Sequence, residues 1–224
     1  YSVQNRRTQF NESVQTFQLK LQDIINDVET GYYPTNNNIN CEVDGAGNVQ
    51  VAPGTNQQGT NEDCVFAGKA IQMDGSTYEA FTLVGKRTAT SINDADLKSV
   101  NFEIEDNFLS NGLEVRRVVA KSDLSLDLDG FSLLPNFGAS SSSGVANKAS
   151  LAVLRDGGVN RLNTATNISS ADIARASQGI TLCLTDNPTS PDDGRKALII
   201  LGTTNIGDPQ VIIDPGSQWQ DEGC

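Results

Sequence analysis

The chain has 224 residues, of which 37% are hydrophobic, and this is enough to bury a core in one or two domains. Its 16 basic and 28 acidic residues give a net charge of −12, so phosphate backbones and anionic headgroups repel it and we expect no nucleic-acid partner. The sequence contains no histidine. It therefore lacks the commonest general base and the commonest transition-metal ligand.

The first thirty residues predict one long amphipathic helix. Its apolar positions recur at steps of four, three, four and three residues, which is the spacing of one helix face. This stripe consists of Phe10, Val14, Phe17, Leu21 and Ile24. Gly31 and Pro34 form a stop signal, so the helix ends near residue 31.

The start of this helix has no N-cap in the sequence. Arg6 and Arg7 stand where basic residues commonly follow a membrane-spanning segment. We therefore expect a hydrophobic, membrane-embedded front half of the helix ahead of Tyr1 in the full-length protein.

Residues 35–63 are rich in Asn, Gly and Gln and predict a surface loop, with one short hairpin around Gly45 and Gly47. The alternative interpretation is a disordered linker. Flanking cysteines at positions 41 and 64 favour a loop that is tied at both ends.

The four cysteines, Cys41, Cys64, Cys183 and Cys224, contain no C-x-x-C pair, which argues against a zinc knuckle or a redox site. An even count in an acidic, Asn-, Ser- and Gly-rich chain indicates disulfides and an oxidising compartment. Of the three possible connectivities, proximity in sequence favours Cys41–Cys64 and Cys183–Cys224. Reduced, buried thiols in a cytosolic protein are the alternative.

Short apolar or alternating segments separated by turn residues follow and predict antiparallel strands. They lie at residues 64–73, 77–86, 99–106, 113–121, 125–134, 148–155, 180–184, 195–202 and 210–214. Residues 168–179 interrupt them with the pattern of a short surface helix. The predicted fold class is α+β, with the long N-terminal helix packed across an antiparallel sheet.

Known catalytic motifs are absent, so we expect no enzyme activity and no cofactor. Acidic loops are the remaining candidates for chemistry, because Ca²⁺ prefers oxygen ligands. The loop with Asp186, Asp192 and Asp193 is a weak calcium candidate, and the run with Asp123, Asp127 and Asp129 is a weaker one. The alternative is that these are solvated carboxylates on an acidic surface.

The order of these elements resembles a type IV pilin-like subunit. The C-terminal part is similar to the GspH/FimT group of minor pilins and pseudopilins, in which a "T-x-C" strand leads to a "GR-x-A-x-I-I" strand. The matching residues are Thr181, Cys183, Gly194, Arg195, Ala197, Ile199 and Ile200. The likeness in sequence motifs covers about 70 residues, and the likeness in the order of elements covers the whole chain. The expected strands outnumber the usual four of a pilin head, so the head is enlarged or holds an extra subdomain near residues 100–150.

The resemblance implies that residues 1–31 are the soluble half of a pilin helix, residues 32–64 an αβ-loop and residues 65–224 a β head whose C-terminal region a disulfide bounds. It implies a structural subunit of a type IV pilus or type II secretion pseudopilus, which serves adhesion, motility or DNA uptake. Such a subunit is anchored in the cytoplasmic membrane before assembly and extracellular afterwards.

The implied partners are other pilin subunits and the membrane, with Phe10, Val14, Phe17, Leu21 and Ile24 in filament packing. The alternative function is a secreted carbohydrate- or surface-binding adhesin module, with Trp219, Tyr32 and Tyr33 as a stacking platform.

Overall fold

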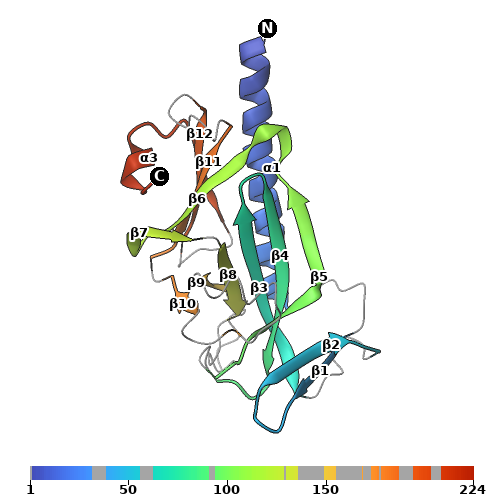
Figure 1. Cartoon of the computed structure of the whole chain (residues 1–224). Coiled ribbons are helices and arrows are strands. Elements are labelled where there is room, and N and C mark those ends of the chain that lie inside the picture. The colour runs from blue at the N-terminus through green and yellow to red at the C-terminus, as the bar shows by residue number, and fades with distance from the viewer. Residues whose placement is uncertain are drawn as a thin grey trace.

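The computed structural model describes most of the chain. The described residues are 2–31, 39–55, 63–90, 94–128, 130–135, 149–154, 168, 173–176, 178–186, 194–202 and 208–224. Helix α1 (Ser2–Thr30) runs along a body of β-sheets and extends beyond it at its N-terminal end (Figure 1). Gly31 follows with φ +68° and donates its N–H to Val28 O at 3.3 Å. The predicted end of the helix is confirmed, because a left-handed glycine closes it.

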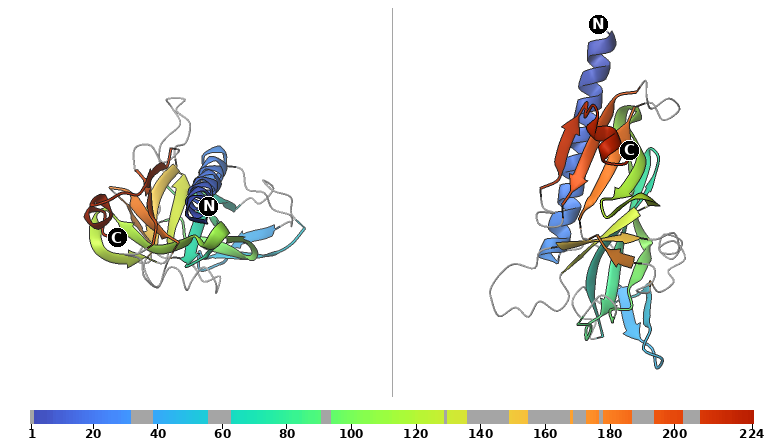
Figure 2. Two further views of the ribbon diagram at one scale, coloured as in Figure 1. Left: turned by 90° about the horizontal axis from the view of Figure 1, so that it is seen from above. Right: turned by 90° about the vertical axis from the view of Figure 1, so that its left-hand side faces the viewer.

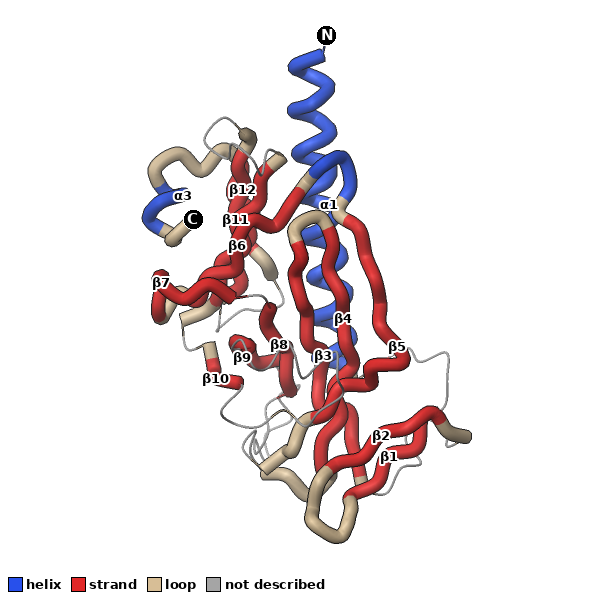
Figure 3. The backbone as a smooth tube through the Cα atoms, viewed as in Figure 1, coloured by secondary structure: helices blue, strands red, loops and turns tan. Residues whose placement is uncertain are grey.

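The strands form three antiparallel sheets (Figure 3). The two-stranded sheet contains β1 (Ile39–Val43) and β2 (Val49–Pro53). In the order of pairing, the six-stranded sheet contains β10 (Ile173–Arg175), β9 (Ala149–Leu154), β8 (Gly130–Pro135), β3 (Cys64–Asp74), β4 (Thr77–Lys86) and β5 (Lys98–Phe108). The five-stranded sheet contains β13 (Gln210–Ile213), β12 (Lys196–Leu201), β11 (Ile180–Thr185), β6 (Glu114–Ala120) and β7 (Asp123–Leu128). Within the described ranges there are also two short helical turns, η1 (Ser110–Gly112) and α3 (Gln218–Asp221).

The predicted fold class is wrong. Strands make up 51% of the structure, and in the described part of the chain they form three sheets instead of one antiparallel sheet with a helix laid across it. The pattern over residues 125–134 shows why, since it contains two strands that belong to different sheets. Gly130 begins β8 so close to β3 that a Cβ would lie 2.4 Å from Ile71 O. The fold is therefore mostly β, with one long N-terminal helix.

The apolar stripe of α1 lies in a core that the two large sheets share. This cluster combines residues of α1 with Ile71, Phe131 and Leu133 of the six-stranded sheet and with Val118, Leu182 and Ile199 of the five-stranded sheet. The helix contacts β3, β8 and β9 on one side and β13 on the other, and Figure 2 shows it running along both sheets. Each large apolar side chain buried in this way contributes about 1.5–3 kcal/mol.

The short helix expected over residues 168–179 is wrong for the part that the structure describes. Residues Ile173–Arg175 form β10, which pairs antiparallel with β9. Ile173 lies opposite Leu154, and Arg175 lies opposite Ala152. Hydrogen bonds across this ladder outweigh a weak helical pattern, because propensity is a small term beside tertiary pairing.

The expected hairpin between the first two cysteines is confirmed as β1–β2, and a disulfide joins Cys41 to Cys64. Asp44 organises its turn. The carboxylate accepts the N–H of Asn48 at 2.8 Å, the side-chain amide of Gln50 at 3.1 Å and the N–H of Ala46 at 2.9 Å. Because these bonds favour the ionised form, the N–H of Asn48 first among them, the pKa of Asp44 lies below its ordinary value of 3.8.

We expect the hairpin tip to lose stability in acid. A carboxyl group whose pKa is lowered by folding stabilises the folded state above its unfolded pKa, and this contribution disappears as the pH falls through the folded pKa. The protection factor of the Asn48 amide, which is the observed exchange rate corrected for the intrinsic rate at each pH, should therefore fall below about pH 4. Asp44→Asn should remove this pH dependence, and amides of β4 serve as the internal reference. An Asn48 amide whose protection is the same in both proteins at every pH contradicts the assignment.

Candidate assembly surface on the N-terminal helix

The first turns of α1 extend beyond the sheets and are exposed. Side chains at positions 4–9 are exposed, and the next residue, Phe10, is buried. The charges in this stretch are those of Arg6 and Arg7. Arg7 Nη2 lies 3.4 Å from Asp214 Oδ2, but both side chains are more than half exposed, so this ion pair adds little stability. The extending part of α1 therefore carries positive charge, whereas the protein as a whole has a net charge of −12.

The residues predicted to pack in a filament lie in the core of their own chain. Phe10, Val14, Phe17, Leu21 and Ile24 are between 0% and 6% exposed, and strands of the same chain cover them. The ring of Phe17 lies 5.3 Å from that of Tyr78 on β4. Their role between subunits stays a prediction, and the helix surface open to another molecule is the opposite one.

The opposite side of α1 forms an exposed polar strip with one apolar residue in its middle. We call it the outer face, and it consists of Glu12, Thr16, Leu19, Asp23, Asn26 and Thr30, at steps of three and four residues. All six side chains are exposed. Leu19 is 60% exposed and is the one large hydrophobic residue exposed among the α1 side chains that the structure describes.

Two polar contacts fix α1 near its exit from the sheets. The hydroxyl of Ser13, 2% exposed, accepts Asn111 Nδ2–H at 2.9 Å and Ser110 Oγ–H at 3.1 Å. On the other side, Gln18 Nε2 donates to Pro209 O at 2.8 Å. These bonds set the height and rotation of the helix relative to both large sheets.

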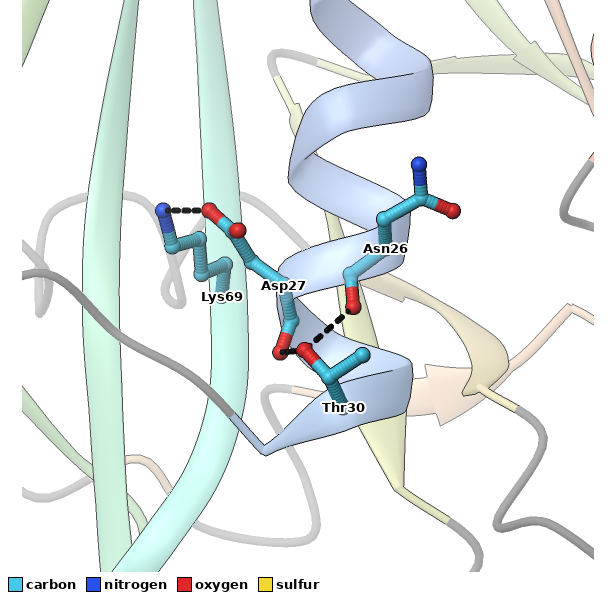
Figure 4. Close-up of polar contacts among 4 residues, drawn as sticks. All are labelled: Asn26, Asp27, Thr30 and Lys69. Carbon is cyan, nitrogen blue, oxygen red and sulfur yellow. Dashed lines mark hydrogen bonds and ion pairs between the residues drawn. The ribbon is translucent and has the colours of Figure 1, made fainter.

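An ion pair between a buried lysine and a partly exposed aspartate fixes the other end of α1 (Figure 4). Lys69 of β3 is 1% exposed, and its Nζ lies 3.0 Å from Asp27 Oδ2. Thr30 closes the last turn by donating its hydroxyl to Asn26 O at 2.8 Å. A cation near a helix C-terminus also interacts favourably with the helix dipole. The sequence signal was a lysine in the middle of a mostly apolar strand, and our sequence analysis missed it.

We expect Asp27→Leu to lower the free energy of unfolding by about 3 kcal/mol, because it leaves the buried Lys69 ammonium without its carboxylate. Adding Lys69→Met should restore most of that loss, since an apolar pair replaces an ion pair at little cost. Chemical denaturation of both variants measures this. Asp23→Leu on the outer face is the matched control and should change stability by less than about 0.5 kcal/mol. A double variant as unstable as the single one contradicts the explanation.

The C-terminal segment covers the outer side of the five-stranded sheet. A disulfide joins Cys183 of β11 to Cys224, as predicted from proximity. Glu222 accepts the hydroxyl of Thr181 at 2.7 Å and the ammonium of Lys121 at 3.2 Å. Trp219 is 3% exposed and packs in a cluster with Val119, Cys183, Leu198 and Ile200. We call residues 214–224 the C-terminal cap.

Removal of the second disulfide should release this cap. Changing Cys183 and Cys224 to Ala is expected to lower stability by about 2–4 kcal/mol and to expose Trp219, the single tryptophan of the chain, which red-shifts its fluorescence. Changing Cys41 and Cys64 to Ala is the control. It should destabilise similarly but leave the native emission unchanged, because that bridge lies in another cluster. Equal native spectra for both variants and the parent protein would show that the cap does not depend on the bridge.

The aromatic platform of the alternative adhesin hypothesis is not formed by Trp219. Its ring is buried, and Lys196 Nζ lies 5.4 Å from the ring centroid. Tyr32 and Tyr33 lie outside the described residues. A buried indole cannot stack on a sugar, so the structure gives this hypothesis no support.

The calcium candidates are only partly described. Asp186 Oδ1 accepts the N–H of Arg195 at 2.7 Å, and Asp192 and Asp193 lie outside the described residues, as does Asp129. Strand β7 contains Asp123 and Asp127, whose register partners on β6 are Ala120 and Val119. Within the described ranges, no group of three or more Cys, Asp or Glu side chains is arranged to hold a metal ion.

Two further findings concern membrane-spanning helices and similarity to known proteins. None of the described helices is long and apolar enough to cross a bilayer. Comparisons with protein-family models, with curated proteins and with solved structures found no match.

Proposed function

We propose that this chain is a structural subunit of an extracellular filament, a type IV pilus or a type II secretion pseudopilus, which acts by assembly and surface contact. The observation that carries the proposal is the division of α1. One side of the helix is fixed in the core of the protein, its opposite side is exposed, and its first turns extend beyond the sheets. The arrangement of the sheets is not part of the support, since it differs from the expected head.

The attachment of α1 suits a helix that transmits mechanical force between a filament and the sheets of its own subunit. Its stripe is buried between two sheets, and polar contacts at Ser13 and Asp27 hold it at both ends of the packed part. A helix needed only to cover a sheet has no reason to extend beyond it, because every exposed turn orders residues without burying them. The extending turns therefore favour a partner that packs against them.

The surface chemistry is consistent with contact between copies of the chain outside the cell. Both disulfides are of the kind that persists in oxidising compartments. The extending turns carry Arg6 and Arg7, whereas the outer face further along α1 carries Glu12 and Asp23. Neighbouring copies displaced along the helix axis would bring these opposite charges together. The membrane is the second proposed partner, and it holds the subunit before assembly.

The test is a change on the outer face that leaves the fold intact. In cells that make the full-length protein, Leu19→Asp should abolish or strongly reduce surface filaments, because it places a charge where helices pack. Immunogold electron microscopy and the amount of subunit in sheared fractions measure the effect. The purified variant should keep the parent melting temperature, since Leu19 is exposed.

The matched control is Leu124→Asp. Leu124 is 41% exposed but lies on β7 of the five-stranded sheet, so this change should leave assembly through α1 intact. Filaments that survive Leu19→Asp, or that are lost equally in both variants, contradict assembly through the outer face. Absence of the parent protein from any surface filament contradicts the proposed function itself.

A further inference from the structure

The turn η1 takes the chain from one large sheet to the other. Asn111 has φ +54° and ψ +34°, and Gly112 has φ +73°. Leu113 donates its N–H to Ser110 O at 3.1 Å across the turn. Two successive left-handed residues closed by this bond are typical of a type I′ turn, for which Asn-Gly is a preferred pair. The only Asn-Gly step of the sequence therefore lies in this turn.

The Asn-Gly step is open to solvent and sterically unhindered. Residues Ser110, Asn111 and Gly112 are all exposed. A Cβ at position 112 would meet no atom within 4 Å, so the space beside the glycine Cα is open. On both sides the turn is fixed to the β3–β4 turn, since Leu109 donates to Ser76 O at 2.8 Å and Val115 donates to Gly75 O at 2.9 Å.

We propose that Asn111 is a site of spontaneous deamidation that is controlled by its contact with α1. The backbone nitrogen of Gly112 loses its proton and attacks Cγ of Asn111, the Cγ–Nδ2 bond breaks, and ammonia leaves. The resulting five-membered succinimide is opened by water to aspartate or isoaspartate. In sum, one water is consumed and one ammonia released, with no oxidant, reductant or enzyme.

The contact with Ser13 restrains this reaction. Ring closure requires the Asn111 side chain to leave Ser13, to which Nδ2 donates at 2.9 Å. The reaction therefore proceeds from a locally opened turn, and its rate follows the population of that state. A variant that lacks the Ser13 hydroxyl should open more often and deamidate faster.

The product no longer fits the contact. Ser13 donates its own hydroxyl hydrogen to Gln9 O at 2.8 Å, so toward η1 its oxygen acts as an acceptor. An amide nitrogen supplies the needed hydrogen, whereas a carboxylate has none to donate. Deamidation thus places two acceptors against each other and adds a negative charge where α1 leaves the sheets. The expected consequence is a weaker attachment of α1 to η1 at Ser13.

The rate is tested on the purified protein during long incubation at physiological temperature and slightly alkaline pH. Peptide mapping by mass spectrometry should show conversion at Asn111 several-fold faster than at Asn26, which is also exposed but is followed by Asp27 within α1. Ser13→Ala should increase the rate at Asn111 and leave that at Asn26 unchanged. Equal rates at the two asparagines, or no effect of Ser13→Ala, overturn the proposal.

The consequence is tested with Asn111→Asp, which places the carboxylate in the turn from the start. Its melting temperature should lie below that of the parent and below that of Asn111→Gly. Glycine keeps the left-handed turn and loses the same hydrogen bond without adding a charge. An Asn111→Asp protein as stable as the parent overturns the predicted weakening of the helix attachment.

Discussion

Burial of the apolar stripe of α1 is the interaction on which the rest of this structure depends. The two large sheets do not form one continuous sheet, and the cluster that joins them is built around the side chains of the helix. Phe10 begins this stripe and Val28 ends it, so one side of the helix is fixed over five turns. Loss of the helix would expose the inner sides of both sheets at once. The sheets and the helix are therefore a single folding unit.

Polar contacts give this apolar association a unique register. A hydrophobic stripe alone would tolerate sliding or rotation of the helix, because hydrophobic burial has no direction. Ser13 meets the turn η1 at one end, and Asp27 meets Lys69 at the other. A buried ion pair adds little net stability but penalises every arrangement that separates its partners. It thereby defines which helix side faces outward.

The same division determines what the helix can offer to another molecule. The apolar stripe of α1, which is the strongest pattern in the sequence, is buried against strands of the same chain. The outer face instead carries Leu19 among polar side chains. In the proposed filament, contacts between subunits would depend on a few exposed residues and on the charges of the extending turns. The C-terminal cap has the opposite role, because it buries Trp219 and so removes the most obvious binding side chain from the surface.

Local signals in the sequence determined the elements of this protein. Periodicity and the glycine at position 31 gave the helix and its end, and alternating patterns between turn residues gave β3, β4 and β11 with an error of at most one residue at either end. Spacing along the chain also gave both disulfides, because each joins cysteines that are neighbours in sequence. In the candidate surface, the sequence identified the buried stripe and the exposed arginines.

Only the tertiary structure decided how these elements combine. The division into three sheets depends on which strands pair, and pairing joins residues far apart in sequence that no local pattern encodes. It makes residues 173–175 a strand, and it brings Lys69 to Asp27 and Asn111 to Ser13 across 42 and 98 positions. Leu19 could be called the centre of an exposed face only after the opposite side of α1 was seen to be covered. Periodicity fixes which residues share a side of an element, but packing alone determines which side is covered, by what and how firmly.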